Sequence, residues 1–198
     1  MLLPASGWLY SASASLEPMS ANIAYIGLGS NLDSPAGSPI ATLAAAIARL
    51  RNLGEITAQS SVYETEPVGF TQQPRFLNAA VALAADISPL ELLQQLLAIE
   101  REFGRDRRLT LSKGPRTLDL DLLLVGNTVA AGAQLTLPHP AIAERRFVLA
   151  PLAEIAPQLI HPVLGKPVAT LLAELPDEGQ NRILAVNILP AGSEKRIS

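Results

Sequence analysis

Two aspartates alternate with leucines near the middle of the chain. Residues 118–122 read Leu-Asp-Leu-Asp-Leu, and this alternation is typical of a strand with one buried face. A slip of one residue would bury both carboxylates and expose the leucines, so only one register of this strand is acceptable. Asp119 and Asp121 therefore project from the same face, about 6.6 Å apart along the backbone at roughly 3.3 Å per residue.

Helix and strand signals alternate on both sides of this segment. We predict strands over residues 23–28, 56–63, 76–85 and 117–125. Helices are predicted to begin after the N-cap pairs Ser38-Pro39 and Ser88-Pro89, and to end before Gly54 and Gly104. The order β-α-β, β-α-β predicts an α+β fold, a ferredoxin-like α/β sandwich with a mostly antiparallel sheet.

Further elements are expected towards the carboxyl terminus. They are a short strand over 134–137 and helices over 147–155 and 167–175. We expect one domain over residues 22–190, preceded by a disordered extension over 1–21 and followed by a loose tail over 191–198. The first segment is rich in serine and alanine, and Met19 offers an alternative start.

Composition limits the partners that this chain can bind. A formal net charge of -3 gives no reason to expect nucleic acid. No run approaches the roughly 18 to 20 apolar residues that cross a bilayer, so we expect no membrane span. The absence of cysteine rules out disulfides and zinc-cysteine sites and suits the cytoplasm. We expect a monomer that binds small molecules.

The acid pair is preceded by a basic segment. Two adjacent carboxylates repel each other unless they are protonated or bridged by a cation, and hard oxygen ligands suit Mg²⁺. The basic residues before the pair are Arg105, Arg107, Arg108, Lys113 and Arg116. Guanidinium groups neutralise phosphate charge, so the combination favours an enzyme that transfers a phosphoryl group from a nucleotide. The alternative is a solvated sheet edge beside a solvated basic loop.

Five short motifs occur in a specific order along the chain. They are residues 24–32 (AYIGLGSNL), 61–65 (SVYET), 76–81 (FLNAAV), 114–121 (GPRTLDLD) and 137–140 (LPHP). With these motifs the chain resembles the 6-hydroxymethyl-7,8-dihydropterin pyrophosphokinases of folate biosynthesis over most of its length. The resemblance implies transfer of the β,γ-diphosphate of ATP to the hydroxymethyl group of the pterin, with release of AMP.

The resemblance also implies a set of site residues. Asp119 and Asp121 would bind two Mg²⁺ ions on the ATP triphosphate, and Arg105 and Arg116 would close over the phosphates as catalytic residues. The ATP-binding residues would be Glu100, Arg107, Leu122, Thr136, His139 and Arg145. The pterin-binding residues would be Thr65, Glu66, Val68, Phe76, Asn78 and Phe147, with the two phenylalanines on either side of the ring.

Other interpretations of these residues remain open. Taken alone, His139 is typical of a loop histidine, and Phe76 and Phe147 are typical of a core. Lys113 stands where some members of the family carry an aromatic residue. A ferredoxin-like sensor or scaffold domain is a second hypothesis, and a nucleotide hydrolase that needs no pterin is a third. Gly27-Leu28-Gly29 weakly suggests a dinucleotide loop, but Leu32 stands where the third glycine would be.

Overall fold

A computed structural model describes residues 22–69, 71–105, 114–176 and 183–187. The elements in chain order are β1 (Asn22–Ser30), α1 (Pro39–Leu50), β2 (Glu55–Gln59), β3 (Val62–Thr65), β4 (Phe76–Ala85), α2 (Pro89–Glu102), β5 (Asp119–Val125), β6 (Ala130–Ala131), β7 (Thr136–Leu137), the 3-10 helix η1 (Ile142–Glu144), α3 (Arg146–Ile155), α4 (Val168–Glu174) and β8 (Ile183–Asn187). The predictions for residues 1–21 and 191–198, and for Arg107 and Lys113, lie outside the described residues.

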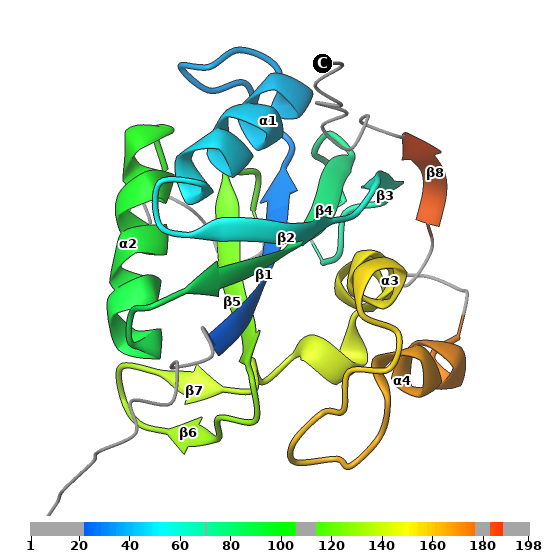
Figure 1. Ribbon diagram of the computed structural model, residues 1–198. Helices are drawn as coiled ribbons and strands as arrows, with labels where there is room; N and C mark the ends of the chain where they lie inside the picture. Colours follow the sequence, from blue (N-terminus) through cyan, green and yellow to red (C-terminus); the bar gives the residue numbers. More distant parts are fainter. Residues whose placement is uncertain (1–21, 70, 106–113, 177–182, 188–198) are drawn as a thin grey trace, which may run out of the picture.

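One six-stranded sheet forms the centre of the molecule (Figure 1). Its strand order is β5-β1-β4-β3-β8, and β2 also pairs with β4. Every pairing in the described part of this sheet is antiparallel. The short strands β6 and β7 form a separate antiparallel pair. The predicted α+β class, antiparallel sheet and extra carboxyl-terminal elements are confirmed.

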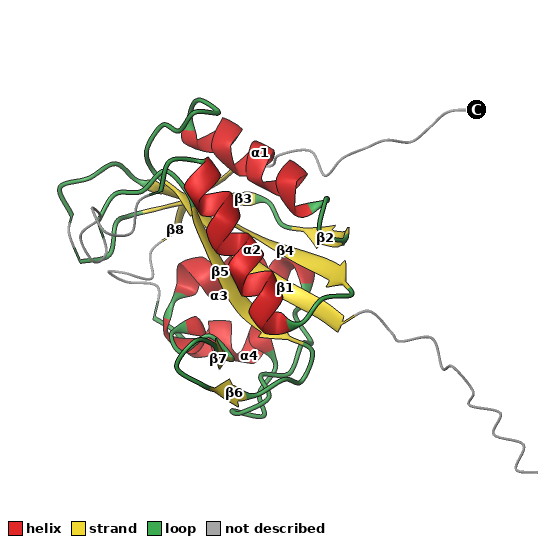
Figure 2. Ribbon diagram, turned by 90° about the vertical axis from the view of Figure 1, so that its left-hand side faces the viewer, coloured by secondary structure: helices red, strands yellow, loops and turns green. Residues whose placement is uncertain are grey.

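Helices cover both faces of the sheet. α1 and α2 lie over one face, as Figure 2 shows, and α3 and α4 lie on the other. Leu120 and Leu122 belong to the core beneath α1 and α2, whereas Leu123 packs with the residues of α3 and α4. The leucines predicted to be buried are therefore buried, and Asp119 and Asp121 face the α3 side.

The helix ends follow the local signals in the sequence. Ser38 and Ser88 are the N-cap residues, each followed by proline. The backbone N–H of Glu91 donates a hydrogen bond of 3.2 Å to Ser88 Oγ. Gly104 follows α2 with a φ of +82°, the left-handed conformation that ends many helices.

Two predicted strands differ from the structure, and two observed strands were not predicted. The single strand expected over 56–63 is divided into β2 and β3 at Ser60. Ser60 Oγ accepts a hydrogen bond of 2.8 Å from Ala80 N, so a side chain takes the place of a backbone carbonyl and the ladder is interrupted. The strand expected over 134–137 is shorter, and its partner β6 was not predicted. β8, which pairs with β3, was also missed.

A helix long and apolar enough to cross a bilayer does not occur among the residues that the structure describes. The longest described helix, α2, has 14 residues.

Gly54 gives a prediction for stability. A Cβ atom at this position would collide with the carbonyl oxygen of Ala84 and lie 3.1 Å from Ala85 Cα. Because backbone atoms cannot rotate away, Gly54→Ala should lower the free energy of unfolding by about 1 to 3 kcal/mol, measured by urea denaturation. Gly132→Ala is the control, since its Cβ would lie 3.6 Å from the nearest atom, Leu135 O. Equal stability of the two variants would contradict the prediction.

Candidate active site

The floor of the site is the central strand β1. Gly29 pairs with Asn78 on β4 and with Asp119 on β5, and Gly27 pairs with Asp121. Cross-strand partners share one face of a sheet. A Cβ at Gly29 would lie 3.3 Å from Asn78 Oδ1 and 3.7 Å from Asp119 Cβ. The glycines therefore leave the space between the acids and Asn78 open.

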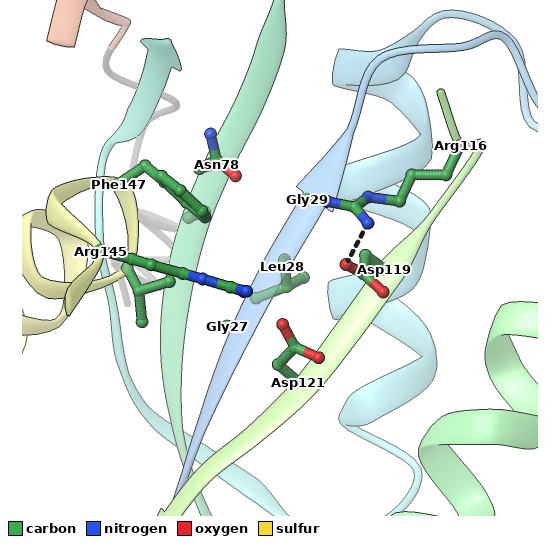
Figure 3. A pocket seen from close by; sticks show the side chains of 11 residues that line it. Gly27, Leu28, Gly29, Asn78, Arg116, Asp119, Asp121, Arg145 and Phe147 are labelled. Carbon is green, nitrogen blue, oxygen red and sulfur yellow. Dashed lines mark ion pairs between the residues drawn. The ribbon is translucent and has the colours of Figure 1, made fainter. Parts of the chain in front are cut away.

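A pocket occupies this space (Figure 3). Its walls come from β1, β4, β5, α3 and the residues that flank them. The lining residues are Gly27, Leu28, Gly29, Asn78, Ala79, Arg116, Asp119, Asp121, Arg145, Phe147 and Val148. The tertiary structure thus brings together six residues predicted for the site, namely Asn78, Arg116, Asp119, Asp121, Arg145 and Phe147.

The two carboxylates of the pocket differ in their partners. Asp119 forms ion pairs with Arg105, at 2.9 Å between Nη2 and Oδ1, and with Arg116, at 3.2 Å between Nη1 and Oδ2. Asp121 has no hydrogen bond or ion pair with any residue in the described part of the chain. Asp119 is therefore neutralised by arginine, whereas Asp121 presents its carboxylate to the pocket (Figure 3).

The environment of Asp121 favours its protonated form. Burial raises the pKa of the Asp121 carboxyl above its ordinary value, and the negative charge of Asp119 raises it further. Three positive or ionisable groups oppose this rise, namely His139, Arg116 and Arg145. A positively charged ligand would stabilise the ionised form of a carboxylate in such surroundings.

Asp121 therefore lowers the stability of the protein at neutral pH. A raised pKa in the folded state means that the native protein binds the proton more tightly than the unfolded chain, so stability falls as pH rises through the folded-state pKa. Without divalent cation, Asp121→Asn should melt at a higher temperature than the unchanged protein at pH 7, and the difference should disappear below about pH 4. Thermal melts across this range test the prediction, and a lower melting temperature at pH 7 would contradict it.

Arg116 is held between an acid and an aromatic ring. Its guanidinium carbon lies 4.9 Å from the centre of the Phe76 ring, an arrangement typical of a cation-π contact. Its Nε is buried and makes no hydrogen bond within the described structure. Phe76 is buried, and Arg116 lies over its ring. Phe147, in contrast, lines the pocket with Arg145, whose guanidinium carbon lies 5.8 Å from its ring centre.

Asn31 supports this arrangement, and sequence reasoning assigned it no role. Its amide donates to Gln73 Oε1 at 3.0 Å and to Pro74 O at 2.9 Å. Its Oδ1 accepts a hydrogen bond of 2.8 Å from Arg116 N. Buried amides need such partners, and Asn31 thereby connects the end of β1 to the loop before β4 and to Arg116. Its place in the motif over 24–32 was the only available signal.

Five of the six residues predicted to bind the pterin lie on or near β3 and β4, and the sixth, Phe147, lies on α3. Asn78 Nδ2 donates a hydrogen bond of 2.8 Å to Thr65 Oγ1, and both residues are buried. Glu66 lies in the loop that follows β3, where its carboxylate is 3.4 Å from Arg75. Val68 is partly buried in the same loop. Neither Glu66 nor Val68 lines the pocket.

The residues predicted to bind ATP are more scattered. His139 lies close enough to Asp121 to influence its pKa, and its backbone N–H donates to Leu123 O at 2.9 Å. Thr136 is exposed on β7. Glu100 is buried, and its carboxylate accepts a hydrogen bond from Leu120 N. Leu122, also predicted for the nucleotide site, has its side chain in the core beneath α1 and α2, because alternate residues of β5 face opposite sides.

The acid pair has the chemistry of a divalent cation site completed by a ligand. No group of three or more carboxylate, histidine or cysteine side chains suited to a metal occurs in the described ranges. Asp119 and Asp121 therefore supply only part of a coordination shell, and phosphate oxygens and water complete such shells for Mg²⁺. An open carboxylate beside arginines, in a pocket with an accessible aromatic ring, is typical of an enzyme that handles phosphorylated substrates.

Comparison with known proteins identifies the family. The family model of 7,8-dihydro-6-hydroxymethylpterin-pyrophosphokinase (HPPK) matches residues 25–157. The 2-amino-4-hydroxy-6-hydroxymethyldihydropteridine pyrophosphokinase of Bacillus subtilis is 46% identical over 140 residues, which are 70% of this chain and 80% of that protein. Its counterpart from Synechocystis is 44% identical over 161 residues, 80% of this chain and 78% of that protein.

Solved structures agree with this fold. The wild-type HPPK-DHPS of Plasmodium falciparum matches with a TM-score of 0.58 at 15% identity, over 77% of this chain and 44% of that chain. The chain belongs to the HPPK family. It is an ATP-using pyrophosphokinase of folate biosynthesis, which confirms the activity predicted from its motifs.

Proposed function

We propose that the pocket between β1, β5 and α3 is where the diphosphate of ATP passes to the hydroxymethyl oxygen of 6-hydroxymethyl-7,8-dihydropterin, with AMP as the leaving group. The observation that carries this proposal is the open carboxylate of Asp121 beside Asp119, with Arg116 and Arg145 on the walls of the same pocket. Negative charge on transferring phosphate groups needs cationic surroundings, and this pocket supplies them.

Asp119 and Asp121 are the residues that would hold Mg²⁺, as two ions together with the ATP phosphates. When bound, Mg²⁺ supplies positive charge that orients the phosphate oxygens and stabilises their developing charge. Among the described residues Asp121 has no ion pair, and its pKa is raised. Both features fit this assignment, because a bound cation would pair with the carboxylate and lower its pKa. Arg105 and Arg116 would neutralise the remaining phosphate charge as catalytic residues. Arg145 lines the pocket and His139 lies close enough to Asp121 to influence its pKa, so we assign both to contact with the triphosphate.

Asn78 and Phe147 would recognise the pterin. Asn78 Nδ2 donates its hydrogen bond to Thr65. The side-chain oxygen of Asn78, which lies beside Gly29, can therefore accept a hydrogen bond from the edge of the pterin ring. Phe147 offers one stacking face at the pocket wall. Phe76 would supply the other face only if Arg116 moved off its ring when substrates bind.

We also assign the sheet to the ferredoxin-like type. The order β5-β1-β4 followed by β2 and β3 places the strands of two βαβ units alternately across the sheet. From its length and its lack of cysteine we also propose a single domain over residues 22–190 that acts as a monomer in the cytoplasm.

One assay separates this proposal from its alternatives. The protein is incubated with ATP and Mg²⁺, with and without 6-hydroxymethyl-7,8-dihydropterin, and nucleotide products are separated by chromatography. AMP that forms only with the pterin is the expected result. Nucleotide cleavage at the same rate without the pterin would indicate a hydrolase, and absence of any product would favour a sensor or scaffold.

A further inference from the structure

Glu100 is a buried carboxylate beneath the acid pair. Its side chain is 2% exposed, and its Oε1 accepts a hydrogen bond of 2.8 Å from the backbone N–H of Leu120. Leu120 lies between Asp119 and Asp121 on β5, whose partner in the described sheet is β1 alone. A buried N–H on the outer edge of a strand needs an acceptor. Glu100 therefore holds the main chain at the point from which both pocket carboxylates project.

Arg105 connects Glu100 to Asp119. Its guanidinium, on a side chain that is 9% exposed, is 2.9 Å from Asp119 Oδ1 and donates to Leu118 O at 3.0 Å. Its Nε is 3.5 Å from Glu100 Oε2, but this buried nitrogen makes no hydrogen bond within the described residues. One arginine thus lies between two carboxylates and is fully engaged only with Asp119.

We propose that Glu100 is a positioning residue that retains Arg105 when Asp119 binds a divalent cation. A cation at the acid pair competes with Arg105 for Asp119. A small shift of the guanidinium towards Glu100 gives its Nε the missing hydrogen bond and keeps the buried charge paired. This role rests on the proposed function, because it takes Asp119 and Asp121 as the cation site. It differs from the direct contact with ATP that the sequence suggested for Glu100.

Removing the charge of Glu100 should therefore weaken cation binding at a distance. Glu100→Gln keeps an oxygen that accepts the Leu120 N–H, but Arg105 then has Asp119 as its remaining carboxylate in this network. We expect the dissociation constant of Mn²⁺, measured by electron paramagnetic resonance on the protein without nucleotide, to rise about tenfold or more. In an Arg105→Ala background, Glu100→Gln should change this dissociation constant less than about twofold, because the guanidinium that competes with Mn²⁺ for Asp119 is gone.

The Mn²⁺ titrations distinguish a wrong metal site from a wrong role for Glu100. If the unchanged protein binds no Mn²⁺ by itself, the titration is repeated with a non-hydrolysable ATP analogue, whose phosphate oxygens complete the coordination shell. No protein-dependent Mn²⁺ binding with the analogue would mean that the acid pair is not a cation site and that both this role and the proposed metal site are wrong. If the unchanged protein binds Mn²⁺ and Glu100→Gln binds it equally well, only the role of Glu100 is wrong. An undiminished effect in the Arg105→Ala background would exclude Arg105 as the intermediary. Gly54→Ala, which is destabilised far from the pocket, should bind Mn²⁺ normally, and an equal loss there would show general loss of structure.

Discussion

Replacing Asp119 and Asp121 together by alanine should lower pterin-dependent AMP release at least about 10³-fold, or roughly 4 kcal/mol of transition-state stabilisation. The two carboxylates are the only acidic side chains that line the described pocket. Within the described ranges Asp121 has no ion pair, whereas Asp119 is already held by two arginines. The single Asp121→Ala variant should therefore lose nearly as much activity as the double variant, because groups that act as one unit are not additive.

Initial rates at saturating ATP and pterin measure this effect. Asp86→Ala is the matched control. Asp86 is an exposed acid that follows the last residue of β4, whereas Asn78 lies near the first. The control should keep the activity of the unchanged protein. Retained activity in the double variant would remove the acid pair from the mechanism. A folded double variant, checked by its melting temperature, excludes loss of structure as the cause.

Arg116→Ala should lower kcat about 10²- to 10³-fold and raise the KM for ATP only a few-fold. Asn31 fixes the backbone of Arg116, and Asp119 holds its guanidinium through an ion pair. The guanidinium is therefore already in place beside the acid pair before substrates bind. Such preorganised charge contributes most where charge develops in the transition state.

The comparison of kcat with KM decides the role of Arg116. An unchanged kcat with a large rise in KM would mean that Arg116 binds ATP equally in the ground state and the transition state. Arg49→Ala is the control, since Arg49 forms a surface ion pair with Glu102, at 2.9 Å, on the helical layer away from the pocket. This control should leave both constants unchanged.

Local patterns in the sequence predicted most of the elements. The Leu-Asp alternation placed the acids and the leucines of β5 on opposite faces, because side chains alternate strictly along a strand. The serine-proline pairs at 38–39 and 88–89 mark helix starts through backbone geometry within one turn. The motif over 76–81 lies in β4, whose predicted bounds match the structure.

Features that depend on distant pairing could not be predicted in this way. Ser60 interrupts a strand through a bond to Ala80, and β8 forms only because the edge of β3 accepts it. Both depend on which segments meet in space, and neither leaves a periodic signal. The same reason applies to Asn31, whose partners lie 42, 43 and 85 residues away.

The sequence by itself determined that Asp119 and Asp121 share one face, that basic residues precede them and that the chain carries the motifs of a pterin pyrophosphokinase. The tertiary structure alone decided that Asp119 is paired while Asp121 is open, and that Gly27 and Gly29 provide the floor between them and Asn78. It also placed Glu100 behind the acids rather than in the pocket. Periodicity specifies the direction of a side chain, whereas its partners are specified by the packing of strands and helices that are distant in the chain.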